Sequence, residues 1–484
     1  MLRVPLLLLG FGKMGGAAFR SFLSVGESLR GDGIAVDLLG ILEADQKVLE
    51  EQRVPHVTGN AKLVVSSASG GVPLRETLYT ALGLQAPDRF VVFDATPSHC
   101  HHSNLIEICE GFPHALYLGE KPLFTSREQL CSLDRFGQRV CCDFVENLSL
   151  PMIGIGKMIR EGFSIRTLRF WRLNSSGVLK VLLPEERVGV TGGALLDKAI
   201  HDLSATSMLL ENSAGAFVED AVILSFMPFS GNPIYVNRFL SSLGTTHKEI
   251  GLHADGSWTA DAAGFAKTRW LTDSHCARAE YAYSWIGIDQ FEQLAIRSGY
   301  PSLRGEMRNF DFDESSWLYR EHKDAGLFTS FEQQEVRLAI IEGQMDGIPV
   351  QLVANFLDRP GIAPFLFETR TKTFINLDGP RYGANSLCRI LDQTIRSYAL
   401  SEPELNCSIS GRVINQAHRA AFDIRDYAFS RGFSGPAFEW NRSIETIGTQ
   451  LKTRYRSSLR QELLTGSRDA SPASKFVAVG LTSE

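Results

Sequence analysis

The sequence lacks the features that mark several large classes of protein. Its leucine-rich opening run ends at Gly10, and no apolar run approaches the roughly 20 residues that cross a bilayer. It also lacks a lysine- and arginine-rich tract, since 49 basic and 55 acidic residues leave a net charge of −6. We therefore expect neither a membrane-spanning protein nor the basic surface that nucleic acid or an anionic membrane requires.

Cysteine is sparse and follows no pattern. The eight cysteines of the 484 residues form no Cys-x-x-Cys pair and lack the density of a secreted disulfide scaffold, so we expect mostly buried thiols. The opening apolar run is too short for a signal peptide and has no cleavage site before folded sequence begins. The expected location is therefore the cytoplasm.

One stretch, His99 to His102, contains the residue types that bind zinc. If it is extended, however, neighbouring side chains point in alternating directions, and no second group of ligands follows at a usual spacing. We predict no metal site.

The opening stretch is typical of a dinucleotide-binding strand, turn and helix. An apolar run of strand length leads directly into Gly-x-Gly-x-x-Gly and a helix start rich in small residues. Gly10 would permit the tight turn, Gly12 would let the backbone approach a pyrophosphate, and Gly15 would let the helix close onto the strand. The phosphates would meet free N–H groups at the helix N-terminus. The candidate cofactor-binding residues here are Gly10, Phe11, Gly12, Lys13, Met14 and Gly15.

An acid follows the second apolar run, which extends from Ile34 to Glu43. In a dinucleotide-binding fold, an acid at this place hydrogen-bonds the adenosine ribose hydroxyls. The charge of Glu43 would repel a 2′-phosphate, which favours NAD over NADP. The alternative is a solvated acid at the end of the strand.

Strand and helix patterns alternate over about the first 145 residues, which predicts a parallel sheet with right-handed crossovers. We expect helices over 14–30, 73–84 and 103–110, and further strands beginning at 34, 89 and 115. The strand that begins at 89 stops at Thr96-Pro97. Residues that follow it then lie at the carboxyl end of the sheet, where open α/β sheets bind ligands.

Three motifs together resemble the Gfo/Idh/MocA family, which contains glucose-fructose oxidoreductase and inositol dehydrogenase. They are the glycine turn, a Thr-Pro-x-x-His strand end and a Glu-Lys-Pro strand end. The second and third supply Thr96, Pro97, His101, Glu120, Lys121 and Pro122. The resemblance implies that Thr96, Pro97, His101, Glu120 and Lys121 lie at the cofactor.

A later segment, Gly192 to Leu203, is similar to the family's Gly-Gly-x-x-x-Asp-x-x-x-His helix. Asp197 and His201 are four residues apart, so a regular helix places them on one face. The family pattern assigns Lys121, Asp197 and His201 to catalysis. Lys198 and Asp202 have the same spacing and are interpreted as a helix-surface ion pair, or Lys198 reaches substrate or cofactor.

The resemblance implies an α/β plus α+β protein. An N-terminal Rossmann domain with a parallel sheet would span 1–146, and a substrate domain with an open, largely antiparallel sheet would span 147–465. A flexible tail would follow at 466–484. Period-2 runs at 336–341, 349–356 and 365–377 suit that second sheet, with a hairpin at Asp346-Gly347, and helices are expected over 385–400 and 411–430. Residues 240–330, with Trp258, Trp270, Trp285 and Trp317, and the segment from 431 are interpreted as extensions.

The expected function is hydride transfer between NAD(P) and a secondary alcohol or ketone of a sugar, cyclitol or nucleotide sugar. His201 would act as the base, Asp197 would orient its ring or share the proton, and Lys121 would stabilise charge on the substrate oxygen. Two alternatives stay open: a redox-neutral reaction through tightly held NAD, and a non-catalytic NAD-binding sensor. A small polyhydroxylated substrate and self-association through the open sheet are also expected.

Overall fold

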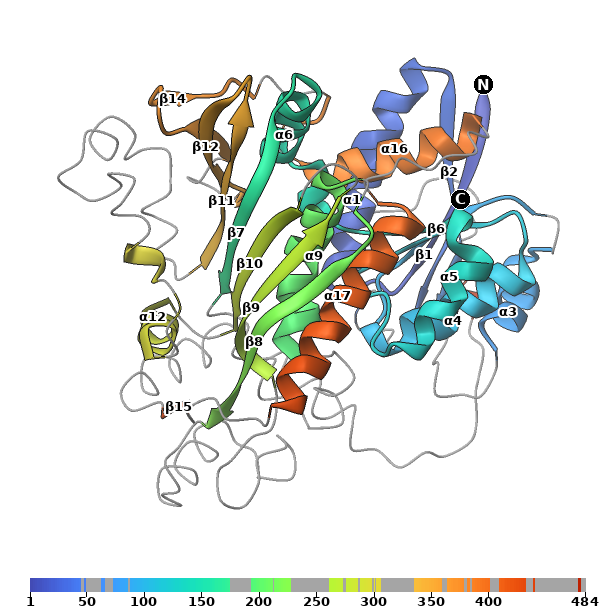
Figure 1. The fold of residues 1–484 in the computed structure, drawn as a ribbon. Coiled ribbons are helices and arrows are strands. Elements are labelled where there is room, and N and C mark those ends of the chain that lie inside the picture. The colour runs from blue at the N-terminus through green and yellow to red at the C-terminus, as the bar shows by residue number, and fades with distance from the viewer. Residues whose placement is uncertain are drawn as a thin grey trace.

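A computed structural model gives the fold (Figure 1). The residues that it describes are 1–44, 48, 62–65, 73–85, 88–174, 193–211, 213–227, 261–272, 276–285, 288–297, 300, 302–305, 335–358, 364–377, 381–383, 385–400, 409–431, 438–439 and 478–479. No helix within these ranges combines the length and the apolar character needed to cross a membrane. Trp258, Trp317, Cys407 and all of the expected tail except 478–479 lie outside them.

The first sheet has the strand order β16-β3-β2-β1-β4-β5-β6, and every neighbouring pair is parallel except β16–β3. Its strands are β1 Leu2–Leu9, β2 Ile34–Glu43, β3 Lys62–Val65, β4 Val91–Asp94, β5 Leu116–Gly119, β6 Val140–Cys142 and β16 Ala478–Val479. The order reverses direction between β1 and β4, which is where a doubly wound sheet opens a ligand crevice. The predicted parallel sheet is confirmed.

Helices cover both faces of this sheet. They are α1 Lys13–Gly31, α3 Leu74–Thr77 with its π-helical continuation η2 Leu78–Leu82, α4 Ser98–Gly111, η3 Glu128–Leu130, α5 Cys131–Phe136 and η4 Gly137–Arg139. In β1, Leu6 and Leu8 belong to a cluster with α1, whereas Leu7 and Leu9 pack in a cluster with α4. Successive side chains of β1 point to opposite faces of the sheet, and helices cover both faces, so the side chains on both faces must be apolar.

One predicted boundary is wrong. Helix α4 begins at Ser98, directly after Pro97, and not at Ser103. The stretch His99 to His102 is therefore helical and not extended. Proline fixes its φ angle at a value that suits the start of a helix, so the helix begins at the residue that follows Pro97.

The second sheet has the order β14-β13-β12-β11-β7-β10-β9-β8-β15. Its strands are β7 Ser164–Asn174, β8 Ala216–Met227, β9 Asp261–Leu271, β10 Cys276–Ser284, β11 Glu335–Met345, β12 Ile348–Asn355, β13 Phe365–Glu368, β14 Thr373–Phe374 and β15 Phe438–Glu439. All neighbours are antiparallel except β7–β10 and β8–β15. Asp346 and Gly347 have φ of 52° and 76°, as the two central residues of the expected hairpin turn require.

Two expectations about this sheet need correction. Strands β9 and β10 lie in its middle, so the interpretation of 240–330 as an extension is wrong for both of them. Tyr281 and Trp270 are also fully buried in the core. The run 365–377 is a hairpin of β13 and β14 and not one alternating strand.

Seven further helical segments lie in the described part of the chain after β6. They are η5 Val145–Leu148, α6 Leu150–Arg160, η7 Leu195–Ala199, α9 Ile200–Leu209, α12 Ile288–Arg297, α16 Ser386–Leu400 and α17 Gly411–Ser430. Helix α17 lies between the sheets, against α9 and β8 on one side and β6 on the other (Figure 1). Helix α16 packs on α1, and its Ile390, Leu391 and Ile395 complete the core of the first sheet. A division of the chain at residue 146 stays a prediction, and α16 lies beyond that boundary.

Candidate active site

The carboxyl ends of β1, β2, β4 and β5 meet at one edge of the first sheet. Backbone hydrogen bonds continue past the strands: Gly10 donates to Leu42, Ala95 to Leu9 and Glu120 to Asp94, each at 2.8 Å. The glycine turn, the Thr96 loop and the Lys121 loop are therefore neighbours. This is the edge at which parallel α/β sheets bind ligands.

The glycine turn has the shape that a bound pyrophosphate requires. Gly10 has φ +76°, a conformation that L side chains rarely adopt, and a Cβ on Gly15 would stand 2.1 Å from the carbonyl oxygen of Gly10. Around Gly12, by contrast, no described atom outside the local chain lies within 4 Å of where a Cβ would stand. Helix α1 starts at Lys13 with Gly12 as its N-cap, so its first N–H groups face this open side. The residues present fit the phosphates of a dinucleotide.

Glu43 lies at the end of β2 and faces the same turn. Its Oε2 accepts a short hydrogen bond from the backbone N–H of Phe11, and its Oε1 accepts one from Ala44 at 2.8 Å. The carboxylate is therefore fixed at the edge of the proposed cofactor crevice, which is where an adenosine ribose would lie.

The Thr96 loop is held by a buried acid. Asp94 is fully buried at the end of β4, and its Oδ1 accepts hydrogen bonds from the N–H of Thr96 at 2.9 Å and its hydroxyl at 2.6 Å. Its Oδ2 accepts from Asn104 at 2.8 Å and from the Tyr117 hydroxyl. Pro97 then starts α4. This network fixes the conformation of the loop.

His101 connects two strand-end loops. One ring nitrogen lies 2.8 Å from the carbonyl oxygen of Thr96, and the other lies 2.8 Å from that of Pro122. The ring is 1% exposed. As placed, His101 therefore holds the Thr96 and Lys121 loops together, and both of its nitrogens contact protein.

Lys121 crosses to the second domain. Its Nζ donates to the carbonyl oxygen and to Oδ1 of Asp197, each at 2.8 Å. The other carboxylate oxygen of Asp197 accepts from Trp285 at 2.8 Å and lies 3.3 Å from Nζ of Lys198. Burial alone would lower the pKa of Lys121, but Asp197 and Glu120 outweigh it and raise the pKa. Lys121 therefore remains an ammonium group.

Glu120 precedes Lys121 and is buried beside a second acid, Asp143, which follows β6. Burial and the nearby Glu120 carboxyl raise the pKa of Asp143 well above its usual range. Two carboxyl groups this close favour sharing one proton. Of the two, the Glu120 carboxyl contributes to the negative surroundings that raise the pKa of Lys121.

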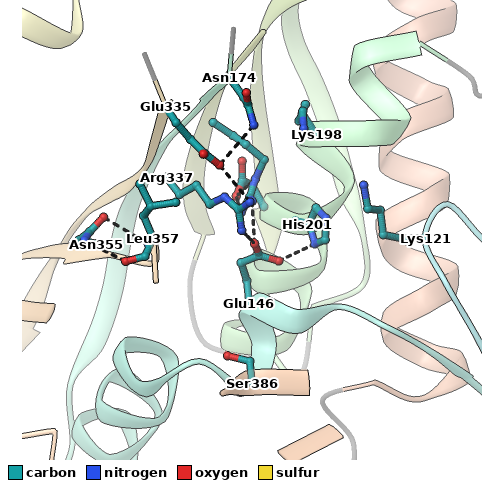
Figure 2. Close-up of polar contacts among 12 residues, drawn as sticks. Lys121, Glu146, Asn174, Lys198, His201, Glu335, Arg337, Asn355, Leu357 and Ser386 are labelled. Atoms are coloured by element: carbon teal, nitrogen blue, oxygen red, sulfur yellow. Dashed lines mark hydrogen bonds and ion pairs between the residues drawn. The ribbon is translucent and has the colours of Figure 1, made fainter. Parts of the chain in front are cut away.

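The carboxylate at the His201 ring comes from another segment of the chain. Residues Leu195–Ala199 form a turn of π-helix before α9 begins at Ile200. The carboxylate that contacts Nδ1 of His201 is that of Glu146 in η5, with Nδ1 and Oε2 2.5 Å apart (Figure 2). Asp197 was expected to orient this ring, but the structure places Glu146 at Nδ1 and bonds Asp197 to Lys121 and Trp285.

A buried arginine stands behind this contact. Arg172 of β7 donates to Glu146 Oε1 at 2.7 Å and to Asp202 Oδ1 at 2.7 Å, and all three side chains are less than 5% exposed. Asp202 therefore pairs with Arg172, and the expected surface pair of Lys198 with Asp202 is wrong. Burial raises the pKa of Asp202 to about 6, although Arg172 opposes the shift.

A second arginine approaches from β11. Nη1 of Arg337 lies 3.2 Å from Glu146 Oε1, and Nη2 lies 3.1 Å from Glu335 Oε1 (Figure 2). The side chain of Asn174, at the end of β7, donates to the same Glu335 oxygen at 3.2 Å. One end of the second sheet thus presents a continuous polar network beside His201.

Sequence reasoning named Lys121, Asp197 and His201 as candidates but did not name Glu146, Arg172 or Arg337. The Glu146 position follows β6 in the crossover between domains, where a lone acid has no distinctive spacing. The arginines stand on strands that read as ordinary alternating sequence. Their role depends on strand pairing, since β11 pairs with β7 at Arg337 opposite Arg172.

Comparisons with known proteins bear on the fold. No family model matches the sequence, and no curated protein matches it. Among solved structures, an oxidoreductase domain protein from Kribbella flavida has a TM-score of 0.59 at 14% identity, covering 89% of this chain and 98% of that one. Levoglucosan dehydrogenase in complex with NADH and levoglucosan has a TM-score of 0.57 at 15% identity, covering 88% and 97%. An NAD-binding oxidoreductase from Klebsiella pneumoniae has a TM-score of 0.54 at 13% identity, covering 89% and 98%.

This likeness extends over nearly nine-tenths of the chain and confirms the fold, a parallel Rossmann-like sheet followed by a mixed, mostly antiparallel sheet. At such low identity it describes architecture. The roles of individual residues depend on the geometry given above.

Proposed function

We propose that the protein is an NAD(P)-dependent oxidoreductase that acts on a secondary alcohol or ketone of a sugar, cyclitol or nucleotide-sugar-like substrate. One observation carries the proposal: Lys121, at the ligand-binding edge of the first sheet, bonds Asp197 one helical turn before His201. A cofactor in the glycine turn and a substrate at the second domain would then share one site. That levoglucosan dehydrogenase was solved with NADH and a sugar supports the same class of ligands.

The cofactor would be held by the glycine turn and the strand-end loops. Phe11, Lys13 and Met14 supply the backbone around the phosphates, and Thr96, Pro97, His101 and Glu120 fix the loop that would face the nicotinamide half. When bound, NAD supplies the hydride chemistry. Because the Glu43 carboxylate faces the turn, a 2′-phosphate would meet like charge there, so we propose NAD in preference to NADP.

Three side chains would carry the proton and charge chemistry. We assign His201 as the group that takes the proton of the substrate hydroxyl, because burial lowers the pKa of the ring and leaves it neutral at working pH, with one nitrogen free to accept. The Lys121 ammonium stabilises negative charge that develops on the same oxygen. Asp197, fixed by Trp285, holds the Lys121 side chain in place.

The proposal includes a cytoplasmic homo-oligomer with a small polyhydroxylated substrate. The outer face of the second sheet supports self-association. Leu271 at the end of β9 and Phe217 at the start of β8 are exposed apolar side chains that another copy would cover.

The test is a spectrophotometric assay of NAD and NADP reduction over a panel of sugars, sugar acids, cyclitols and nucleotide sugars. With the substrate found, Lys121→Met and His201→Gln should each lower kcat on the order of 10²–10⁴-fold while NADH still binds. Lys157→Met, which removes an exposed lysine paired with Glu161 at 3.9 Å, is the matched control and should leave kcat unchanged.

Undiminished turnover in both site variants would remove these assignments. Conversion of a substrate without net NADH would instead indicate a redox-neutral reaction, and NADH binding without any conversion would indicate a sensor.

A further inference from the structure

We infer that Glu146 is the positioning residue of the candidate active site. Its carboxylate holds the His201 ring as the tautomer protonated on Nδ1, which leaves the Nε2 lone pair to accept the substrate proton. The catalytic use of Nε2 rests on the function proposed above, whereas the tautomer does not.

The first argument is geometric. Oε2 of Glu146 lies 2.5 Å from Nδ1 of His201, and the side chains are 3% and 8% exposed. At this separation two lone pairs would repel each other, and an ionised carboxylate has no proton to give, so Nδ1 must carry the proton of this contact. A neutral imidazole has one N–H, and Nε2 is then the acceptor nitrogen. In Figure 2 the ring lies between Glu146 and Lys121.

The second argument concerns the charge of Glu146. A buried carboxyl group tends to take up a proton, and a protonated Glu146 could donate to the ring and reverse the tautomer. Arg172 and Arg337 prevent this, because both guanidinium groups donate to Oε1, at 2.7 and 3.2 Å. Burial raises the pKa of Glu146, but Arg172, His201 and Arg337 outweigh it and hold the pKa well below its usual range.

The third argument concerns the charge of His201. A protonated ring beside Glu146 would form an ion pair, and Nε2 would then carry a proton and could not act as a base. Burial, with the positive charges of Lys121 and Arg172, lowers the pKa of His201 more than Glu146 raises it. The ring is therefore neutral around pH 7, and the contact to Glu146 decides which nitrogen holds its single proton.

The arrangement also explains why the arginines are buried in the sheet. Each comes from a different strand, β7 and β11, and each carries a further acid, Asp202 or Glu335. Moving one member of such a network away from its partners would leave a buried charge unpaired, at a large cost in free energy. The network therefore holds the Glu146 carboxylate in a fixed position. A base held this firmly loses little entropy on reaching the reactive geometry.

The decisive experiment is NMR of the full-length protein labelled with [15N]histidine, without substrate, at neutral pH. His201 is assigned by the signal that disappears in His201→Gln. The expected result is a protonated Nδ1 and an unprotonated Nε2 for His201. In Glu146→Gln the amide can donate or accept, so the single tautomer should give way to a mixture or to the reversed form.

The control is Glu342→Gln, which breaks another arginine pair on β11, to Arg169 at 2.9 Å, away from His201. It should leave the His201 signals unchanged. A wild-type His201 protonated on Nε2, or on both nitrogens, would overturn the inference, and this result does not depend on whether Glu146→Gln folds.

Kinetics gives a second readout once a substrate is known. Glu146→Gln should lower kcat on the order of 10–100-fold, with the affinity for NADH close to wild type. A loss of NADH affinity in parallel with kcat would mean a structural role and would contradict the inference. If no substrate is turned over, the proposed function fails while the tautomer measurement still decides the role of Glu146.

Discussion

The glycines of the turn and of α1 allow a prediction in which the space around each glycine decides whether alanine stabilises or destabilises the protein. Gly15, Gly26 and Gly12 all belong to the start or the body of α1, and alanine would replace each with one methyl group. At a helix interior, alanine is more favourable than glycine by about 1 kcal/mol. The three sites differ in what the new Cβ would contact.

For Gly15→Ala the contact is prohibitive. The Cβ would lie 2.1 Å from the backbone oxygen of Gly10, where separations under 3.0 Å are essentially never seen, so the turn and helix must separate by about 0.9 Å. Such overpacking costs about 1–3 kcal/mol and exceeds the gain in helix propensity. For Gly26→Ala the nearest atom is Cβ of Val36 at 4.0 Å, an ordinary contact, so the gain should remain.

Gly12→Ala separates cofactor binding from stability. No described atom outside the local chain is within 4 Å of its Cβ, so the only cost to stability is that of alanine at an N-cap, at most about 1 kcal/mol. The methyl group would, however, occupy the space proposed for the pyrophosphate, and NADH affinity should fall by about tenfold or more.

The assay pairs thermal unfolding with NADH fluorescence titration. Unfolding midpoints should fall by roughly 2–4 °C in Gly15→Ala and rise slightly in Gly26→Ala. NADH affinity should fall in Gly15→Ala and Gly12→Ala only. A Gly15→Ala protein as stable as wild type, or a Gly12→Ala protein with full NADH affinity, would refute the reasoning.

Two further predictions concern acids. Glu43→Ala should weaken NAD binding about tenfold and raise the affinity for NADP relative to NAD, as measured by titration with both cofactors. The control Asp37→Asn, on the exposed side of the same strand, should change neither affinity. An unchanged preference for NAD over NADP in Glu43→Ala would exclude Glu43 from the ribose site. Burial raises the pKa of Asp261 to about 7 from 3.8, so the folded state loses stability as pH rises between these values. Asp261→Asn should therefore raise the free energy of unfolding at about pH 8 and leave it unchanged near pH 4, as measured by urea unfolding at both pH values. An equal effect at both pH values would contradict the explanation that a buried carboxylate charge destabilises the folded state at the higher pH.

Local chemistry made much of the fold predictable. The Asp346-Gly347 turn, the apolar strand before Gly10 and the amphipathic helix that ends at Gly31 each follow from short-range rules that the sequence states directly. The places of β9 and β10 in the second sheet do not follow from such rules. Their pairing is non-local, and the segments before and after them read as irregular.

The candidate site divides in the same way. Lys121, Asp197 and His201 stand in motifs with fixed local spacing, so a resemblance could mark them. Glu146 could not be found, because its meaning depends on partners 26 and 191 residues away, Arg172 and Arg337. The i,i+4 spacing of Asp197 and His201 could not show which carboxylate contacts the His201 ring, because that carboxylate comes from another segment of the chain.

The helix that carries Asp197 and His201 reaches different partners from one site. The side chain of Asp197 contacts Lys121 and Trp285, whereas His201, four residues on, contacts Glu146. Because the two positions are about one helical turn apart, they lie on the same side of the helix. The ammonium group that Asp197 holds is therefore near the imidazole, and its positive charge helps to lower the pKa of His201. The helix thus brings the proposed charge-stabilising group and the proposed base together, although a separate acid holds each of them.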